Sequence, residues 1–135
     1  MKLKIIIAEW ESSNKYILKK ILERFQNIEI IEVNNGYEAW DVIISEDPDI
    51  IILDIFLEKI GGIKLTRKIR QFDKFRNTLI IGLSGYNHNM ELKPLSDAGF
   101  DRFFENPLDI RLLEATLSKF INNSQAVSIK PKIKI

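Results

Sequence analysis

Residues 49–62 read DIIILDIFLEKIGG, and this stretch decides the fold. Residues 50–53 form an unbroken apolar run, which is typical of a strand buried on both faces of a parallel sheet. The run ends at Asp54, and a short loop with a Gly-Gly pair then leads into a helical pattern. In open α/β sheets, binding and chemistry occur beyond the carboxyl ends of the strands. The sequence therefore predicts that Asp54 lies in the functional crevice.

The segments on either side of this stretch alternate between strand and helix patterns. Apolar runs predict four further strands, at residues 3–8, 28–33, 79–83 and 101–104. Apolar residues at helical spacing predict five helices, over residues 14–25, around 39–44, over 63–72, over 88–98 and around 113–121. Ser12 or Ser13 is expected to cap the first helix and Asp109 the last, while Pro94 should kink the fourth helix or delay its start. Five alternations predict a doubly wound α/β sheet with helices on both faces.

Composition narrows the class of protein. The chain has 135 residues, which suits one domain, and 20 basic against 19 acidic residues give a net charge of +1. Without a basic excess, we expect no nucleic-acid binding. The chain contains no cysteine, which fits a cytoplasmic location. The apolar run near the N-terminus is too short for a signal peptide or a membrane span, so we expect no membrane association.

The C-terminal segment differs from the rest of the chain. We expect a domain over residues 1–122 and a flexible basic tail over residues 123–135. Residues 128–135 read SIKPKIKI, in which Ile and Lys alternate with period two. The alternative interpretation is a strand that adds to a sheet edge, where Pro131 is tolerated.

Polar residues follow three of the predicted strands. Glu9 and Glu11 follow the first, Asp54 ends the third, and Ser84 follows the fourth. Clustered carboxylates suit a hard divalent cation such as Mg²⁺. A carboxylate beside a cation can also attack phosphorus and form an aspartyl phosphate. These strand ends therefore predict a cation or phosphoryl site.

Three segments carry a family resemblance. Residues 48–70 (PDIIILDIFLEKIGGIKLTRKIR), 80–86 (IIGLSGY) and 98–107 (AGFDRFFENP) resemble the receiver domain of two-component response regulators, the chemotaxis-regulator-like family. The resemblance covers residues 3–121. It implies a flavodoxin-like fold, with a five-stranded parallel sheet in the order 2-1-3-4-5 and five helices.

The resemblance also implies roles for particular residues. Asp54 takes the position that accepts a phosphoryl group from a histidine kinase with Mg²⁺ bound. Ser84 and Phe103 take the positions of the hydroxyl and aromatic switch residues, whose inward movement reshapes the face formed by the fourth helix, the fifth strand and the fifth helix. Tyr86 and Phe56 are expected to line the site.

Two positions depart from the family pattern. Trp10 replaces an acidic residue that contacts the metal, and an indole has no lone pair for a cation. Asn106 replaces the lysine that pairs with the phosphoryl group. The remaining candidate metal ligands are Glu9, Asp54 and Glu11, of which Glu11 could reach back past Trp10 to a cation.

These observations leave two main functional hypotheses. The first is a stand-alone, non-enzymatic receiver in a phosphorelay, with a sensor histidine kinase or phosphotransfer protein and a downstream target protein as partners. The second is a pseudo-receiver that binds proteins without phosphorylation, because Trp10 and Asn106 alter the site. A homodimer remains open in both. A flavodoxin-like carrier is a weaker alternative, since two glutamates after the first strand would repel a flavin phosphate.

Overall fold

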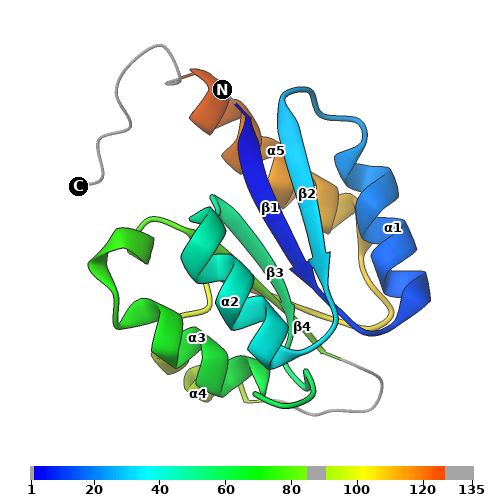
Figure 1. The fold of residues 1–135 in the computed structure, drawn as a ribbon. Helices are drawn as coiled ribbons and strands as arrows, with labels where there is room; N and C mark the ends of the chain where they lie inside the picture. The colour runs from blue at the N-terminus through cyan, green and yellow to red at the C-terminus, as the bar shows by residue number, and fades with distance from the viewer. Residues whose placement is uncertain (1, 85–90, 127–135) are drawn as a thin grey trace.

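The computed structural model describes residues 2–84 and 91–126, with the side chains of residues up to 123 (Figure 1). Its centre is a parallel sheet with the strand order β2-β1-β3-β4-β5, as predicted. The strands are β1 (Leu3–Ala8), β2 (Ile28–Val33), β3 (Ile50–Asp54), β4 (Leu79–Ser84) and β5 (Arg102–Glu105). The helices are α1 (Ser12–Leu22), α2 (Gly36–Glu46), α3 (Gly62–Arg70), α4 (Leu92–Ala98) and α5 (Ile110–Ala126), with a 3₁₀ turn, η1 (Asp73–Phe75), after α3.

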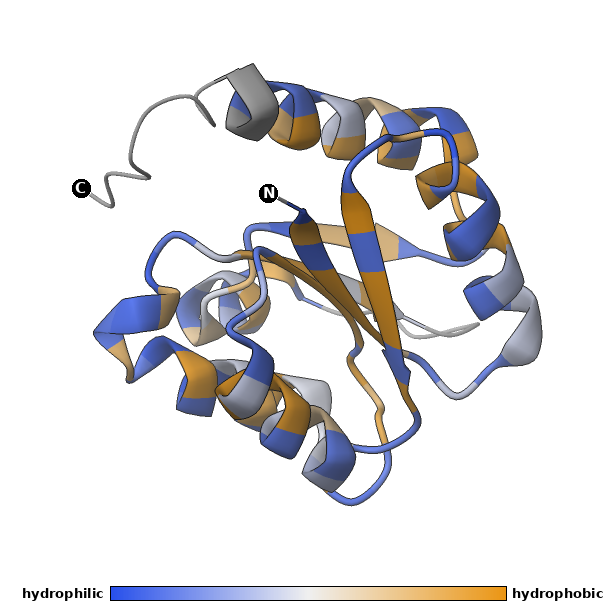
Figure 2. Ribbon diagram, turned by 45° about the horizontal axis from the view of Figure 1, so that its top comes forward, coloured by the Kyte–Doolittle hydropathy of each residue, from blue (hydrophilic) through white to orange (hydrophobic). Residues whose placement is uncertain are grey.

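Helices cover both faces of the sheet. α1 and α5 pack on one face, whereas α2, α3 and α4 pack on the other (Figure 1). Each face buries its own apolar cluster, and hydrophobic residues are concentrated along the strands and on the inner sides of the helices (Figure 2). Within β3, every residue from Ile50 to Asp54 is buried, which explains why its sequence does not alternate. No helix in residues 2–84 and 91–126 is long and apolar enough to cross a bilayer.

The helix ends differ in places from the sequence prediction. α1 begins at Ser12 with Glu11 as its N-cap, so neither Ser12 nor Ser13 is the cap. α4 begins at Leu92, which places Pro94 in its first turn, where a missing N–H costs no helical hydrogen bond. The start of the predicted 88–98 helix lies mostly outside the described residues. Asp109 does cap α5, because its carboxylate accepts a hydrogen bond from the Leu112 N–H at 3.0 Å.

α5 is longer than predicted. It continues to Ala126, so residues 123–126 belong to a helix and not to a flexible tail beginning at residue 123. Residues 127–135, where the predicted tail continues, lie outside the described residues.

One side chain joins several elements on the α3 side of the sheet. The Arg70 guanidinium donates to the carbonyl oxygens of Phe75 at 2.7 Å and Gly99 at 2.9 Å, and to the carboxylate of Asp101 at 2.8 Å. The same Asp101 oxygen accepts from the Ile80 N–H at 2.8 Å. Arg70 therefore fixes the end of α3 to η1, to the end of α4 and to the start of β5.

Candidate functional site

The strand register brings the predicted polar residues to one edge of the sheet. β1 and β4 flank β3, with Ala8 opposite Leu53 and Leu83 opposite Asp54. Glu9, Asp54 and Ser84 therefore follow neighbouring strand ends, and only 2%, 5% and 2% of their surfaces are exposed. The crevice thus contains two buried carboxyl groups and one buried hydroxyl.

The loop after β3 fixes the position of Asp54. The Phe56 N–H donates to the Asp54 Oδ1 at 2.9 Å, while the Phe56 ring is half-exposed at the rim. The loop closes where the Gly62 N–H donates to the Ile55 carbonyl at 2.8 Å. A Cβ atom on Gly62 would lie 2.6 Å from the Asp54 carbonyl oxygen, so only glycine fits at this position. The second of the two glycines in residues 49–62 is thus required by the backbone that carries Asp54.

Asn14, in the first turn of α1, contacts the carboxyl groups of both glutamates. The Glu9 carboxyl accepts from the Glu11 N–H at 3.0 Å and from the Asn14 amide at 3.5 Å. The Glu11 carboxylate accepts from the Ser13 hydroxyl at 2.5 Å and from the Asn14 amide at 3.4 Å. Glu11 is therefore held by α1.

Asn14 is a site residue that the sequence analysis missed. It is buried and lies one turn before Leu18 on the inward stripe of α1. A polar residue among apolar residues at helical spacing was the feature of the sequence that could have identified it.

Burial changes the protonation of the two carboxyl groups. Loss of solvation and, to a smaller extent, the nearby Asp54 charge together raise the pKa of Glu9 to about 7, although the hydrogen bond from the Glu11 N–H opposes this rise. Burial also raises the pKa of Asp54, although hydrogen bonds from the Phe56 N–H, Glu9 and Trp10 oppose this rise. The interaction between the two carboxyl groups raises the pKa of Glu9 and lowers that of Asp54, so Glu9 is the more easily protonated of the pair.

The Trp10 side chain is not buried in the crevice. Its side chain is 59% exposed, yet its interaction with Asp54 lowers the pKa of that carboxyl group and so favours the charged form. A neutral side chain thus interacts with Asp54 from the position where the family pattern has an acidic residue.

The other predicted residues lie on β4 and after β5. The Asn106 N–H donates to the Ser84 carbonyl at 3.3 Å, which places Asn106 beside the crevice. Its side-chain Nδ2 is buried and has no hydrogen-bond partner among the described residues. Phe103 is half-buried and lines a surface hollow with Leu92 and Leu95 of α4. Tyr86 lies outside the described residues.

The crevice offers a divalent cation two buried carboxyl groups, those of Glu9 and Asp54. In the described part of the chain, no three acidic or histidine side chains are grouped so that they could hold a metal ion. Glu11 is held by Ser13 and Asn14, and the Trp10 indole presents a donor, which a cation cannot use.

Comparisons with known proteins agree with this geometry. The response regulator receiver domain family matches residues 5–118. A chemotaxis protein CheY homologue from Campylobacter jejuni is 25% identical over 116 residues, which cover 85% of this chain and 89% of that protein.

Solved structures share the fold. The receiver domain of a sensor histidine kinase from Pseudomonas aeruginosa, with a magnesium ion coordinated in its active-site cleft, is 21% identical with a TM-score of 0.76, covering 90% of this chain and 99% of that chain. A co-crystal from Saccharomyces cerevisiae contains a histidine phosphotransfer signalling protein and the receiver domain of its downstream response regulator. One of its chains is 22% identical with a TM-score of 0.78, covering 94% of this chain and 93% of that chain.

Proposed function

The chain belongs to the response regulator receiver domain family, and we propose that it accepts a phosphoryl group on Asp54 in a two-component phosphorelay. The observation that supports this role is the placement of Asp54. It ends the central strand β3, and the Phe56 N–H fixes one carboxylate oxygen. Ser84 follows on the adjacent strand. A nucleophilic carboxylate with one oxygen held and a hydroxyl nearby suits phosphoryl transfer.

The donor in this proposal is a phosphohistidine of a sensor histidine kinase or of a phosphotransfer protein. An Asp54 oxygen attacks phosphorus, so a P–O bond forms while the P–N bond breaks. The imidazole, protonated on its other nitrogen, leaves as a neutral ring. In this proposal the Ser84 hydroxyl and the Asn106 Nδ2, which has no hydrogen-bond partner among the described residues, donate hydrogen bonds to the phosphoryl oxygens. Asn106 supplies a hydrogen bond there without the positive charge of a lysine.

The output of the proposed receiver is a change in the α4–β5–α5 face, which a downstream target protein reads. Phe103 joins this face to the site, because it lies on β5 and lines the hollow beside α4. This expectation rests on the family to which the chain belongs.

A second function is favoured by one specific observation. Trp10 stands where the family pattern has a carboxylate for the metal, and its interaction with Asp54 lowers the pKa of that carboxyl group. The chain would then be a pseudo-receiver that binds its partner without phosphorylation. Both hypotheses use the same fold and differ in whether Asp54 reacts.

Acetyl phosphate separates the two hypotheses. The protein is incubated with acetyl phosphate over a range of Mg²⁺ concentrations, including none, and its intact mass is measured. A working receiver gains one phosphoryl group, which is absent from Asp54→Ala and retained by the control Asp41→Ala, whose carboxylate is exposed on α2. No adduct at any Mg²⁺ concentration would reject phosphorylation of Asp54 and support the pseudo-receiver.

A further inference from the structure

The surface of α2 and α3 carries apolar side chains that the core does not cover. Tyr37 and Ile44 on α2 are 61% and 37% exposed, and Phe72, which follows α3, is 44% exposed. The rings of Trp40 and Phe72 meet with their centroids 5.7 Å apart, and this contact bridges the two helices. We call Tyr37, Trp40, Ile44 and Phe72 the aromatic seam. The helices α2 and α3, with which these residues lie, pack side by side on one face of the sheet (Figure 1).

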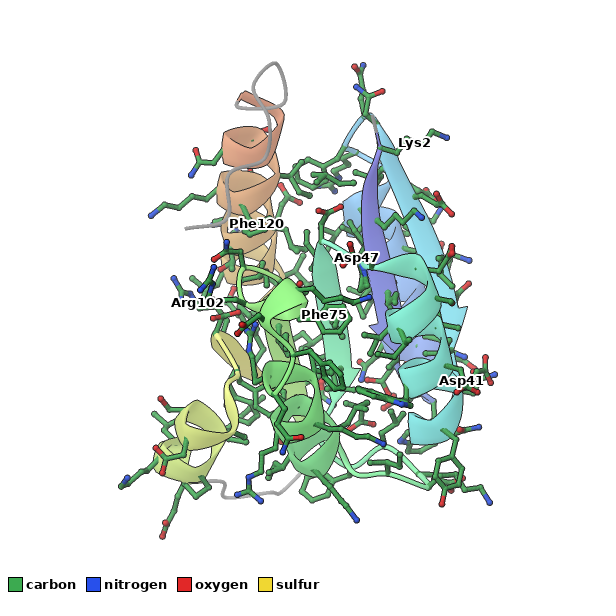
Figure 3. All side chains as sticks on the ribbon, turned by 60° about the vertical axis from the view of Figure 1, so that its left-hand side comes forward. Lys2, Asp41, Asp47, Phe75, Arg102 and Phe120 are labelled. Atoms are coloured by element: carbon green, nitrogen blue, oxygen red, sulfur yellow. The ribbon has the colours of Figure 1, made fainter. Side chains whose placement is uncertain are left out.

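A row of basic side chains borders the aromatic seam. Lys64, Arg67 and Lys68 are exposed at helical spacing on α3, and we call them the basic row. The Lys68 ammonium lies 4.3 Å from the centroid of the Trp40 ring, which joins the row to the seam. None of the three has an ion-pair partner in the part of the chain that the structure describes. Asp41, a nearby acidic residue, lies on the side of α2 that faces away from α3 (Figure 3).

The helix dipole explains only part of the basic row. Positive charge is favourable near the C-terminus of a helix, which accounts for Arg67 and Lys68. Lys64, however, lies in the first turn of α3, where a positive charge is unfavourable. The dipole also gives no reason for exposed apolar residues beside the charges, whereas a partner would cover the seam and pair with the row.

We propose that the aromatic seam and the basic row together bind an acidic amphipathic segment of a partner protein. Apolar side chains of the segment, repeated at helical spacing, would pack on Trp40 and Phe72, and its carboxylates would pair with the basic row. The chain as a whole has a net charge of only +1, so the positive charge of this surface is local. This surface goes beyond the proposed receiver function, because it binds whether or not Asp54 is phosphorylated.

Selection from a peptide display library tests the proposal. Random peptides are selected on the intact protein, and the enriched peptides are measured against two triple variants. One reverses the basic row (Lys64→Glu, Arg67→Glu, Lys68→Glu). The matched control makes the same charge change on α1 (Lys15→Glu, Lys19→Glu, Lys20→Glu). We expect the selection to enrich acidic peptides with aromatic or leucine residues at helical spacing. These peptides should bind the variant with the reversed basic row at least about tenfold more weakly than the natural protein, and should bind the α1 control variant as the natural protein does.

A second readout covers the case in which the charge reversals disturb folding. In a Trp10→Phe protein, Trp40 is the one remaining tryptophan, so peptide binding should change its fluorescence. Phe72→Gln should weaken binding without altering charge. Enriched peptides that are not acidic, equal losses in both triple variants, or an unchanged Trp40 signal would each overturn the proposal. Phosphorylation from acetyl phosphate is measured on the same variants, so failure of this surface is distinguishable from failure of the receiver function.

Discussion

Glu9 directly follows β1 and Asp54 ends the adjacent parallel strand β3, so two buried carboxyl groups lie at neighbouring strand ends, where burial raises the pKa of both. No basic side chain among the described residues offsets their charge through an ion pair. The site therefore resists full ionisation, and this has measurable consequences.

The free energy of unfolding should fall as the pH rises from acidic to neutral values. The pKa of Glu9 is about 7 in the folded protein against an ordinary value of 4.5, so the folded state binds more protons than the unfolded state between these values. The contribution of Glu9 to the free energy of unfolding is therefore fully present below about pH 4.5. It decreases as the pH rises, and above pH 7 the free energy of unfolding is lower by about 3 kcal/mol. The raised pKa of Asp54 acts in the same direction. Urea unfolding at pH 5 and pH 8 measures the difference.

The control for this pH effect is Glu9→Gln, which keeps the shape and a donor for Asp54 but cannot ionise. It should lose much less stability than the natural protein between pH 5 and pH 8. Equal losses in the two proteins would show that Glu9 is not the titrating group.

Restoring the family residues should activate the site. Trp10→Asp supplies a carboxylate where the indole now lies, and Asn106→Lys supplies a positive charge to the phosphoryl oxygens. One well-placed stabilising group is worth about 10²–10³ in rate, so the double variant should be phosphorylated by acetyl phosphate at least about a hundredfold faster, with dependence on Mg²⁺. Time-resolved intact mass measures the rate. If the natural protein already matches the double variant, the pseudo-receiver hypothesis is wrong.

The two glycines after Asp54 should tolerate substitution very differently. A Cβ on Gly62 would lie 2.6 Å from the Asp54 carbonyl oxygen and 2.7 Å from the Ile55 Cα, whereas Gly61 has its nearest atom at 3.8 Å. Gly62→Ala should destabilise the protein by about 1–3 kcal/mol, because backbone must move. Gly61→Ala should change stability by about 1 kcal/mol or less. Urea unfolding compares the two, and similar losses would contradict the described loop.

Arg70→Ala should cost more than the loss of a surface ion pair. Arg70 is partly buried and donates to three carbonyl oxygens and one carboxylate, so its removal leaves several acceptors unpaired. We expect a loss of about 2–3 kcal/mol. The control is Arg24→Ala, which removes an exposed pair with Glu114 and should cost less than about 1 kcal/mol. Thermal or urea unfolding of both variants tests the difference.

The sequence predicted the sheet well because each strand carries its own local signal. The buried runs of β1, β3 and β4 lie within a residue of the predicted bounds, and the order β2-β1-β3-β4-β5 followed from the family resemblance. The residue at which α4 begins could not be predicted. Pro94 indicates that a helix begins near it but does not determine the first residue. The positions of Glu9, Asp54 and Ser84 at the ends of predicted strands also placed them at the carboxyl edge of the sheet.

The chemistry of the site was harder to predict than its position. Proximity of Glu9 and Asp54 follows from strand order, but the rise in their pKa values follows from burial, which depends on all surrounding elements. The sequence showed that Trp10 could not bind a cation, whereas its contact with Asp54 depends on a side-chain rotamer. Asn14 was missed because its role depends on how α1 meets the strand end.

The contacts of Arg70 also bear on the order of folding events. Two of its four acceptors lie 29 and 31 residues further along the chain, on segments that meet only after β4, α4 and β5 have assembled. Such contacts form after the main barrier is crossed when that barrier depends on the central strands. Arg70→Ala should therefore accelerate unfolding much more than it slows refolding, and stopped-flow measurements would show the change mainly in the unfolding limb. Arg70 then determines chiefly how long the folded state lasts.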